Sequence, residues 1–227
     1  MRHFLLSLMI ALASGSVAAT SLADLSPKDT GSGLKEALTR GAEFAVSNLG
    51  KQDGFMGNPK VRIPLPGNIQ KASKLLHGIG LGKQIDELEL TMNRAAEQAV
   101  VEAKPILLDS IKKMSWQDAK AILTGGDDAA TQYFKRTTSE PIHAKFLPIV
   151  KKSTGKLKLA DKYNKVAGKA AGMGMIDKQD ADLDGYVTHK AMDGLYLMIA
   201  EQERSIRKDP IGTGSKLLGK VFGAVGR

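Results

Sequence analysis

An acidic stretch of the sequence matches the first nine positions of a calcium-binding loop. Such a loop takes oxygen ligands from its first, third, fifth, seventh and ninth residues and turns sharply at a glycine in the sixth. The residues on those five ligand positions are Asp180, Asp182, Asp184, Tyr186 (through its carbonyl) and Thr188, with Gly185 on the sixth. The sequence therefore predicts a candidate calcium site, and it indicates no other cofactor.

The same stretch departs from the calcium motif at its last ligand position. The twelfth residue is normally a bidentate glutamate, and here it is Ala191. Losing two of about seven oxygen ligands weakens calcium binding severely. The alternative interpretation is structural: the acidic residues form a turn that leads into a helix capped by Thr188.

A second polar cluster lies on a segment with helical periodicity. Asn93, Arg94 and Glu97 are spaced to share one side of a helix. They could form a ligand-binding or catalytic cluster. The favoured alternative is a solvated helix face with an Arg94–Glu97 pair worth about 0.2–0.5 kcal/mol, because such pairs occur on most surface helices.

Several kinds of catalysis are excluded by what the sequence lacks. The chain has no cysteine, which removes disulfides, thiol catalysis and zinc–thiolate sites. After the leader there is no Gly-x-Ser-x-Gly elbow and no His-Glu-x-x-His pattern. Residues 214–221 approach a phosphate loop but lack its final Ser or Thr and a preceding strand. An enzyme of unrecognised class stays an alternative without named catalytic residues.

The elements that must position these residues are helices, as the central stretch from Lys83 to Thr138 indicates. Apolar residues recur every three or four positions from Ile85 to Met114, as in an amphipathic helix. Pro105 lacks an amide proton and clashes with the preceding turn, so a kink or a helix junction is expected near Lys104.

Two more helices are expected in the rest of this stretch. Ser115 with Asp118 predicts a capping box for the first, which buries Trp116 among its apolar residues. Gly125-Gly126 is expected to end that helix in the left-handed conformation. Asp127 or Asp128 then starts the next one. Short connections of this kind favour antiparallel neighbours.

The flanking segments are expected to complete one helical domain over residues 24–227. Residues 24–33 are turn-rich and expected to be loose, and a first helix follows from Leu34 to Leu49. Near residues 55–68 a short irregular or extended apolar segment is expected, as a lid over a groove or, preferably, as a strap on the core. The final helix, capped by Thr188, is expected to turn Glu203 and Arg207 outward. In all, we expect an all-α fold of about seven to nine helices.

The two ends of the chain carry signals of their own. Residues 1–23 have a basic start, a short apolar run and small residues before Asp24, as in a secretory signal peptide cleaved after Ala23. With no cysteine for a lipid anchor and no later membrane span, a periplasmic or secreted location is expected. Residues 211–227 form a basic amphipathic tail that either docks on the core or lies on a membrane surface.

The formal net charge is +9. A basic exported protein can bind anionic lipid headgroups or an envelope protein, whereas nucleic acid is not an expected partner because aromatic residues do not interleave the basic ones. Lys and Arg are spread along the sequence, so ordinary solubility is the simplest interpretation of the charge.

Several short stretches together resemble one family. They are Met92–Glu97, Met114–Ala119, Ile122–Gly126, Ala130–Phe134, Asp184–Thr188, Asp193–Leu195 and Ile206-Arg207 with Pro210. The chain resembles the domain-of-unknown-function family 4197, which comprises exported bacterial proteins that are largely helical and have no assigned activity. This resemblance implies a single helical envelope domain and transfers no catalytic residues.

Three functions follow as hypotheses. The favoured one is a non-enzymatic envelope protein that binds an apolar ligand, a lipid or a protein partner in a groove between helices. The second is a calcium-dependent structural or adhesion module, and the third is an enzyme of unrecognised class.

Overall fold

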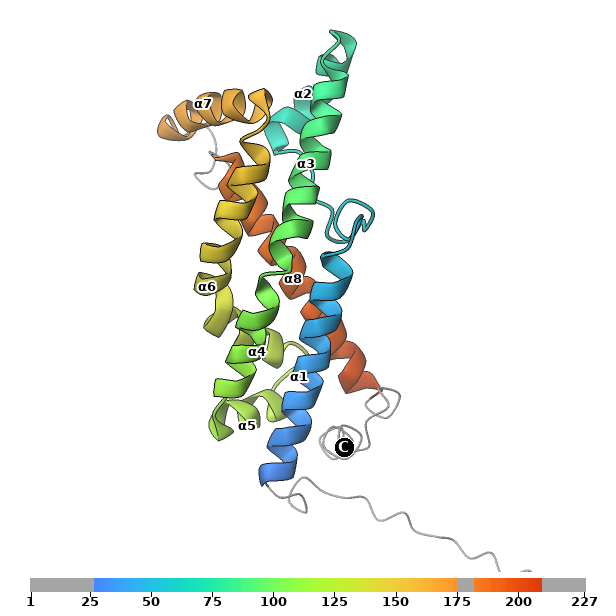
Figure 1. The fold of residues 1–227 in the computed structure, drawn as a ribbon, viewed down its shortest axis with the longest axis vertical. Coiled ribbons are helices and arrows are strands. Elements are labelled where there is room, and N and C mark those ends of the chain that lie inside the picture. Colours follow the sequence, from blue (N-terminus) through green and yellow to red (C-terminus); the bar gives the residue numbers. More distant parts are fainter. Residues whose placement is uncertain (1–26, 175–181, 210–227) are drawn as a thin grey trace, which may run out of the picture.

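The computed structural model describes residues 27–174 and 182–209. Within these residues the chain forms eight helices and no strand, which confirms the expected all-α fold (Figure 1). The helices are α1 Pro27–Leu49, α2 Gly67–Gly78, α3 Gly82–Val100, α4 Ala103–Lys113, α5 Trp116–Thr124, α6 Ala129–Thr154, α7 Lys158–Gly172 and α8 Leu183–Lys208.

The two longest of these helices, α6 and α8, pack antiparallel along their length. Thr154 near the end of α6 contacts Asp184 near the start of α8, and Thr131 near the start of α6 contacts Glu203 near the end of α8. The helices α1, α3 and α4 pack along this pair and give the molecule its elongated shape (Figure 1).

The central stretch folds largely as its local sequence indicates. The helix α3 ends at Val100 and α4 starts at Ala103, so Pro105 lies in a first turn, where its missing amide proton costs nothing. At the start of α5, the Ser115 hydroxyl accepts from the Asp118 amide, and the Asp118 carboxylate accepts from the Ser115 amide. Pro141 and Pro148 lie inside an uninterrupted α6.

Two details of this stretch differ from expectation. Trp116 is 46% exposed instead of buried. Gly125 ends α5 with φ −83° and ψ 177°, an extended conformation rather than a left-handed one. Glycine is still required there, because a Cβ atom would lie 2.7 Å from both the Ala121 carbonyl oxygen and the Ala129 Cβ.

The N-terminal boundary of the fold also differs from the prediction. The helix α1 begins at Pro27, so the expectation of a loose segment over residues 24–33 is wrong from that residue onward. Thr30 and Leu34 are both buried. Burial against the bundle outweighs the low helix propensity of the glycines in this stretch.

The connection between α1 and α2, residues 50–66, is the predicted irregular apolar segment. Its side chains Phe55, Val61, Ile63 and Leu65 are all buried. Gly194 on α8 makes room for it, because a Cβ atom at that position would lie 2.7 Å from the Phe55 ring. Of the two interpretations, a lid over a groove and a strap on the core, these buried side chains support the second. We therefore call residues 50–66 the strap.

Candidate functional site

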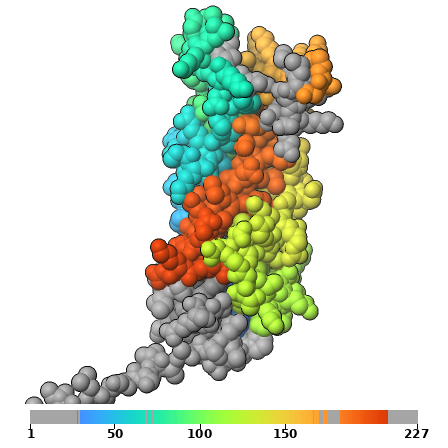
Figure 2. Space-filling model, turned by 180° about the vertical axis from the view of Figure 1, so that it is seen from behind, coloured from blue at the N-terminus to red at the C-terminus, as the bar shows by residue number. Residues whose placement is uncertain are grey.

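Formal charge is distributed very unevenly over the molecule. Residues 67–83 and 151–172 carry ten lysines and one aspartate, a net +9 that equals the formal net charge of the whole chain. All ten lysines are exposed. These segments comprise α2, the start of α3, the end of α6 and α7, which lie at the same end of the molecule (Figure 1 and Figure 2). We call these two segments the basic pole. Carboxylates of neighbouring segments lie beside them, Asp86 against His77 and Asp184 beside Lys151 and Asp161, so the net charge of this end of the molecule is below that of the two segments alone.

The basic pole adds a spatial cluster to the expected spread of cations, since 23 of the 33 Lys and Arg residues lie outside its two segments. The lysines come from two parts of the chain that are far apart in sequence, so a linear scan does not group them. Packing brings α3 against both α2 and α7. Like charges at one end of a protein repel one another and reduce its stability, so their accumulation requires a functional explanation.

The tip of the α2–α3 hairpin adds exposed apolar side chains to the basic pole. Leu75 is 69% exposed, Ile79 63% and Leu81 40%. Apolar residues exposed singly need no explanation, but a contiguous group indicates a binding surface. The lysines of the same hairpin are Lys71, Lys74 and Lys83. The tip is therefore both cationic and apolar, a combination typical of proteins that bind membrane surfaces.

The tip is held in place by His77. Its Nδ1 donates to the Ser73 carbonyl at 2.8 Å, and its Nε2 lies 3.2 Å from the Asp86 carboxylate on α3. The Ser73 hydrogen bond and then the Asp86 carboxylate raise the pKa of His77. The ring packs against Gly82, where a Cβ atom would lie 2.6 Å from it. The turn between the helices uses Gly80 at φ +84°, a conformation that favours glycine.

The predicted polar cluster on α3 is buried and holds the strap. Asn93 is fully buried, and its side chain accepts from the Ile63 amide at 2.8 Å and donates to the Ile63 carbonyl at 2.9 Å. Glu97 is 4% exposed and accepts from the amides of Phe55 and Met56 at 3.1 and 3.2 Å. The solvated-face interpretation is therefore wrong for both residues.

Arg94 completes this cluster at the surface. It donates to Glu97 at 2.6 Å and to Asp53 at 2.8 Å, and these carboxylates, Glu97 first, raise the pKa of Arg94. Every polar group of the cluster thus has a structural partner. A usable signal was present in the sequence, because a long non-helical apolar segment needs donors and acceptors for its buried backbone.

Of the predicted calcium ligands, Asp184, Tyr186 and Thr188 lie in α8, and Asp182 directly precedes it. Asp180 is outside the described residues. The helix α8 starts at Leu183, five residues before the expected Thr188 cap, and Asp182 caps it by accepting from the amides of Asp184 and Gly185. The early start follows from this cap, which satisfies first-turn amides that otherwise lack partners.

The remaining predicted ligands are engaged or enclosed. Asp184 is 8% exposed and bonded to the Thr154 hydroxyl, and burial raises the pKa of Asp184. The Tyr186 hydroxyl donates to the Pro64 carbonyl of the strap at 3.1 Å. Thr188 is fully buried, and its hydroxyl has no partner among the described residues. These contacts favour the structural turn, and the calcium site itself stays a prediction.

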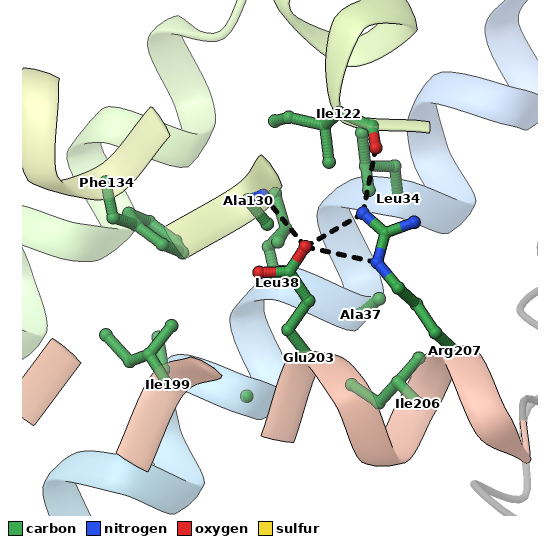
Figure 3. Close-up of a pocket in the computed structure, with 12 residues that line it drawn as sticks. Leu34, Ala37, Leu38, Ile122, Ala130, Phe134, Ile199, Glu203, Ile206 and Arg207 are labelled. Carbon is green, nitrogen blue, oxygen red and sulfur yellow. Dashed lines mark hydrogen bonds and ion pairs between the residues drawn. The ribbon is translucent and has the colours of Figure 1, made fainter. Parts of the chain in front are cut away.

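At the opposite end of α8, Glu203 and Arg207 face inward, against expectation (Figure 3). Glu203 accepts from the amides of Ala130 and Thr131 at 2.9 Å each, and from Arg207 at 2.8 Å. Arg207 also donates to the Ile122 carbonyl at 2.8 Å. The pair thereby caps the start of α6 and the end of α5.

The apolar hollow beside this pair is small. Its free volume is about 20 Å³, enough for about one water molecule. Its apolar walls come from Leu34, Ala37, Leu38, Ala42, Ile122, Ala130, Phe134, Ile199 and Ile206. A lipid chain or another sizeable apolar ligand does not fit into it as it stands.

A larger hollow is an open groove of about 750 Å³ between α4 and α6. The residues lining it are Glu102, Pro105, Ile106, Asp109, Ser110, Lys113, Asp118, Tyr133, Thr137, Pro141 and Lys145. Its charges are mixed, and several are paired: Asp109 with Lys113 at 2.7 Å, and Asp118 with Arg136 at 3.0 Å. Apolar surface of Pro105, Ile106, Tyr133 and Pro141 lies between these charged residues, so the groove is open and mixed in character, unlike the enclosed pockets that bury most of a small ligand.

The predicted signal peptide, residues 1–23, and the amphipathic tail, residues 211–227, lie outside the described residues. None of the described helices combines the length and the apolar character that a membrane span requires.

Comparisons with known proteins give one match. No curated protein and no solved structure matches the chain. A family described as proteins of unknown function (DUF4197) matches residues 24–223, a range that includes the strap, the basic pole and both ends of α8. The chain belongs to this family.

Proposed function

We propose that the protein is a non-enzymatic binding module that docks on an anionic lipid surface through its basic pole. The observation that carries the proposal is the exposed apolar tip of the α2–α3 hairpin within a region that holds a net +9. The expected export of the chain would bring this surface to the cell envelope.

Both components of the basic pole contribute to such binding. A lysine near an anionic membrane contributes about 1 kcal/mol. Transferring Leu75 or Ile79 fully out of water contributes about 1.5–3 kcal/mol each. Stable membrane attachment generally needs two signals, such as an apolar anchor and a polybasic patch, and the hairpin with its neighbouring α7 supplies both.

The geometry supports surface docking over enclosure of a ligand. The hollow beside Glu203 has room for about one water molecule, and the α4–α6 groove is lined by mixed charges. Asp184, the buried acid with a raised pKa, lines neither of them. The enzyme alternative therefore keeps no named catalytic residue.

Vesicle sedimentation tests the proposal. We expect the protein to sediment with vesicles of phosphatidylglycerol and phosphatidylcholine at low salt, and to stay in solution with phosphatidylcholine alone. The triple change Lys71→Gln, Lys74→Gln and Lys83→Gln should weaken binding at least about tenfold, since each lysine contributes about 1 kcal/mol. Leu75→Ser with Ile79→Ser should leave a weaker attachment that salt removes.

A matched control separates the basic pole from net charge. The triple change Lys112→Gln, Lys113→Gln and Lys120→Gln removes the same charge from the other end of the molecule and should alter binding little. If both triple variants lose binding equally, or if wild-type protein ignores anionic vesicles, the proposal is wrong. Binding to an acidic protein in the absence of vesicle binding would also overturn it.

A further inference from the structure

Polar contacts join α6 to α8 at several levels along the interface. Hydrogen bonds connect Thr154 with Asp184, Thr138 with Tyr196, and Thr131 with Glu203. Between the first two levels, His143 of α6 lies opposite His189 of α8. Their ring centres are 5.4 Å apart, and the ring planes are inclined at 52°. No hydrogen bond connects the two rings, so the histidine pair differs from the three hydrogen-bonded contacts between α6 and α8.

One ring of the pair is prepared to act as a ligand. The Nδ1 of His189 lies 2.8 Å from the Gly185 carbonyl oxygen, which can only accept. Nδ1 therefore carries the proton, and Nε2 of the neutral ring keeps its lone pair. Metal-binding histidines commonly hold their second ring nitrogen in this way, with a backbone carbonyl as partner.

The other ring is unconstrained by hydrogen bonds. His143 is half-buried, and within the described part of the chain it has no hydrogen-bond partner. Both of its nitrogens are thus free to bind an external group. Neither histidine belongs to the lysine-rich segments 67–83 and 151–172. A cation bound to them therefore does not lie within those positively charged segments.

The separation of the rings fits a shared metal ion. Two imidazoles on one tetrahedral Zn²⁺, with Zn–N bonds of about 2.0 Å, have ring centres about 5 Å apart. We propose that His143 and His189 form a binding site for a divalent transition-metal ion of the Zn²⁺ class. In the described residues no group of three or more His, Asp or Glu side chains is arranged to hold a metal, so water completes the coordination shell.

This site has functional consequences that differ from those of membrane docking. A metal ion held by one residue from α6 and one from α8 cross-links the two longest helices of the described bundle. It stabilises the folded state by an amount that depends on metal concentration. Imidazole binds a metal only when it is neutral, so the stabilisation decreases as the pH falls.

Calorimetric titration of the full-length protein with Zn²⁺ tests the proposal. We expect one site per chain and a rise in melting temperature that a chelator reverses. His143→Gln and His189→Gln should each lower the affinity more than about tenfold, because losing a ligand costs at least as much as losing an outer-shell partner, and the double variant should show no saturable Zn²⁺ binding at this site.

The chain provides its own controls, because His3 and His77 are its other two histidines. His3→Gln and His77→Gln should leave Zn²⁺ binding at this site unchanged. The proposal is overturned if wild-type protein shows no saturable Zn²⁺ binding at millimolar metal, or if either control variant removes it. It is also overturned if either His143→Gln or His189→Gln retains wild-type affinity.

Discussion

Asp184 and Glu203 are two carboxylates at opposite ends of the α6–α8 interface, and each is 8% exposed. Glu203 receives hydrogen bonds from two backbone amides, a threonine hydroxyl and Arg207. Asp184 receives one from Thr154, and the carboxylates of Asp182 and Asp161 oppose its charge. Equal burial therefore leads to different electrostatic outcomes, because donors and neighbouring charges differ.

The ionised carboxylate of Glu203 is well compensated by its partners, whereas that of Asp184 is poorly compensated. At the Glu203 end, the carboxylate lies at the start of α6, where the helix dipole and free amides favour an anion. At the Asp184 end, burial removes hydration that one hydroxyl replaces only in part, and this raises the pKa of Asp184. The following experiments test that difference.

Glu203→Ala should have the largest effect. It removes the acceptor for the first turn of α6 and one of the groups that the half-buried Arg207 binds. We expect a loss of about 3–5 kcal/mol in the free energy of unfolding, measured by urea denaturation. Glu201→Ala is the control, because Glu201 pairs with the exposed Lys60, and it should cost no more than about 1 kcal/mol. Equal losses for the two variants would mean that Glu203 contributes no more to stability than the surface pair of Glu201 and Lys60.

Asp184→Asn should stabilise the protein in a pH-dependent way. Above the ordinary pKa of 3.8 and up to its raised value, the folded state of the wild type binds more protons at Asp184 than the unfolded state. Stability from this group is therefore present at acidic pH and lost as pH rises through that window. The amide cannot ionise, so the variant should gain up to about 1 kcal/mol over wild type near neutral pH.

Denaturation of both proteins at several pH values between acid and neutral checks this sign. The advantage of Asp184→Asn should increase with pH. If the difference in free energy of unfolding between Asp184→Asn and wild type is constant, or decreases as pH rises, then hydrogen bonds compensate the ionised Asp184 carboxylate as they do that of Glu203.

Thr188→Val should have a smaller effect of the same sign. The buried Thr188 hydroxyl has no partner in the described part of the chain, and valine has nearly the same shape without the polar atom. We expect a gain of about 0.5–1 kcal/mol, because an unpaired buried hydroxyl is costly. Thr138→Val is the matched control, since the Thr138 hydroxyl donates to the Phe134 carbonyl at 2.6 Å, and it should cost about 1 kcal/mol. If Thr188→Val instead lowers the free energy of unfolding, the Thr188 hydroxyl has a hydrogen-bond partner inside the folded protein.

Calcium should have the smallest effect. If the Asp184 end is a structural turn, the melting temperature should be the same with millimolar Ca²⁺ as with a chelator. A rise with Ca²⁺ that is absent in Asp182→Asn would instead support the predicted site, and it would turn the Asp184 end of the interface into a metal-stabilised one.

Local sequence signals predicted much of this fold, and the misses share one cause. The Ser115 capping box, the helix junction before Pro105 and the end of α1 near Gly50 depend on residues close in sequence. The helical pattern places Asn93 and Glu97 on a solvated face because the strap residues that bind them are thirty or more positions away along the chain. A hydrophobicity pattern does not show that a polar residue is buried with a distant backbone partner.

The candidate site was even less accessible to the sequence. The lysines of the basic pole belong to two segments that start 84 residues apart, and only packing places α7 and the α2–α3 hairpin at one end. Leu75 has the spacing from Ile69 and Ala72 that is typical of the apolar face of a helix, yet it is 69% exposed. Periodicity identifies an apolar residue on a helix but not whether a neighbouring helix covers it.

The sequence by itself determined that this chain is a helical protein with breaks near Gly50, Pro105 and Gly125, because those effects act within one turn of the backbone. Tertiary structure alone decided which polar residues are buried and that the two lysine-rich segments meet at one end. The physical reason is that burial and charge density depend on contacts between distant segments, which no local pattern specifies.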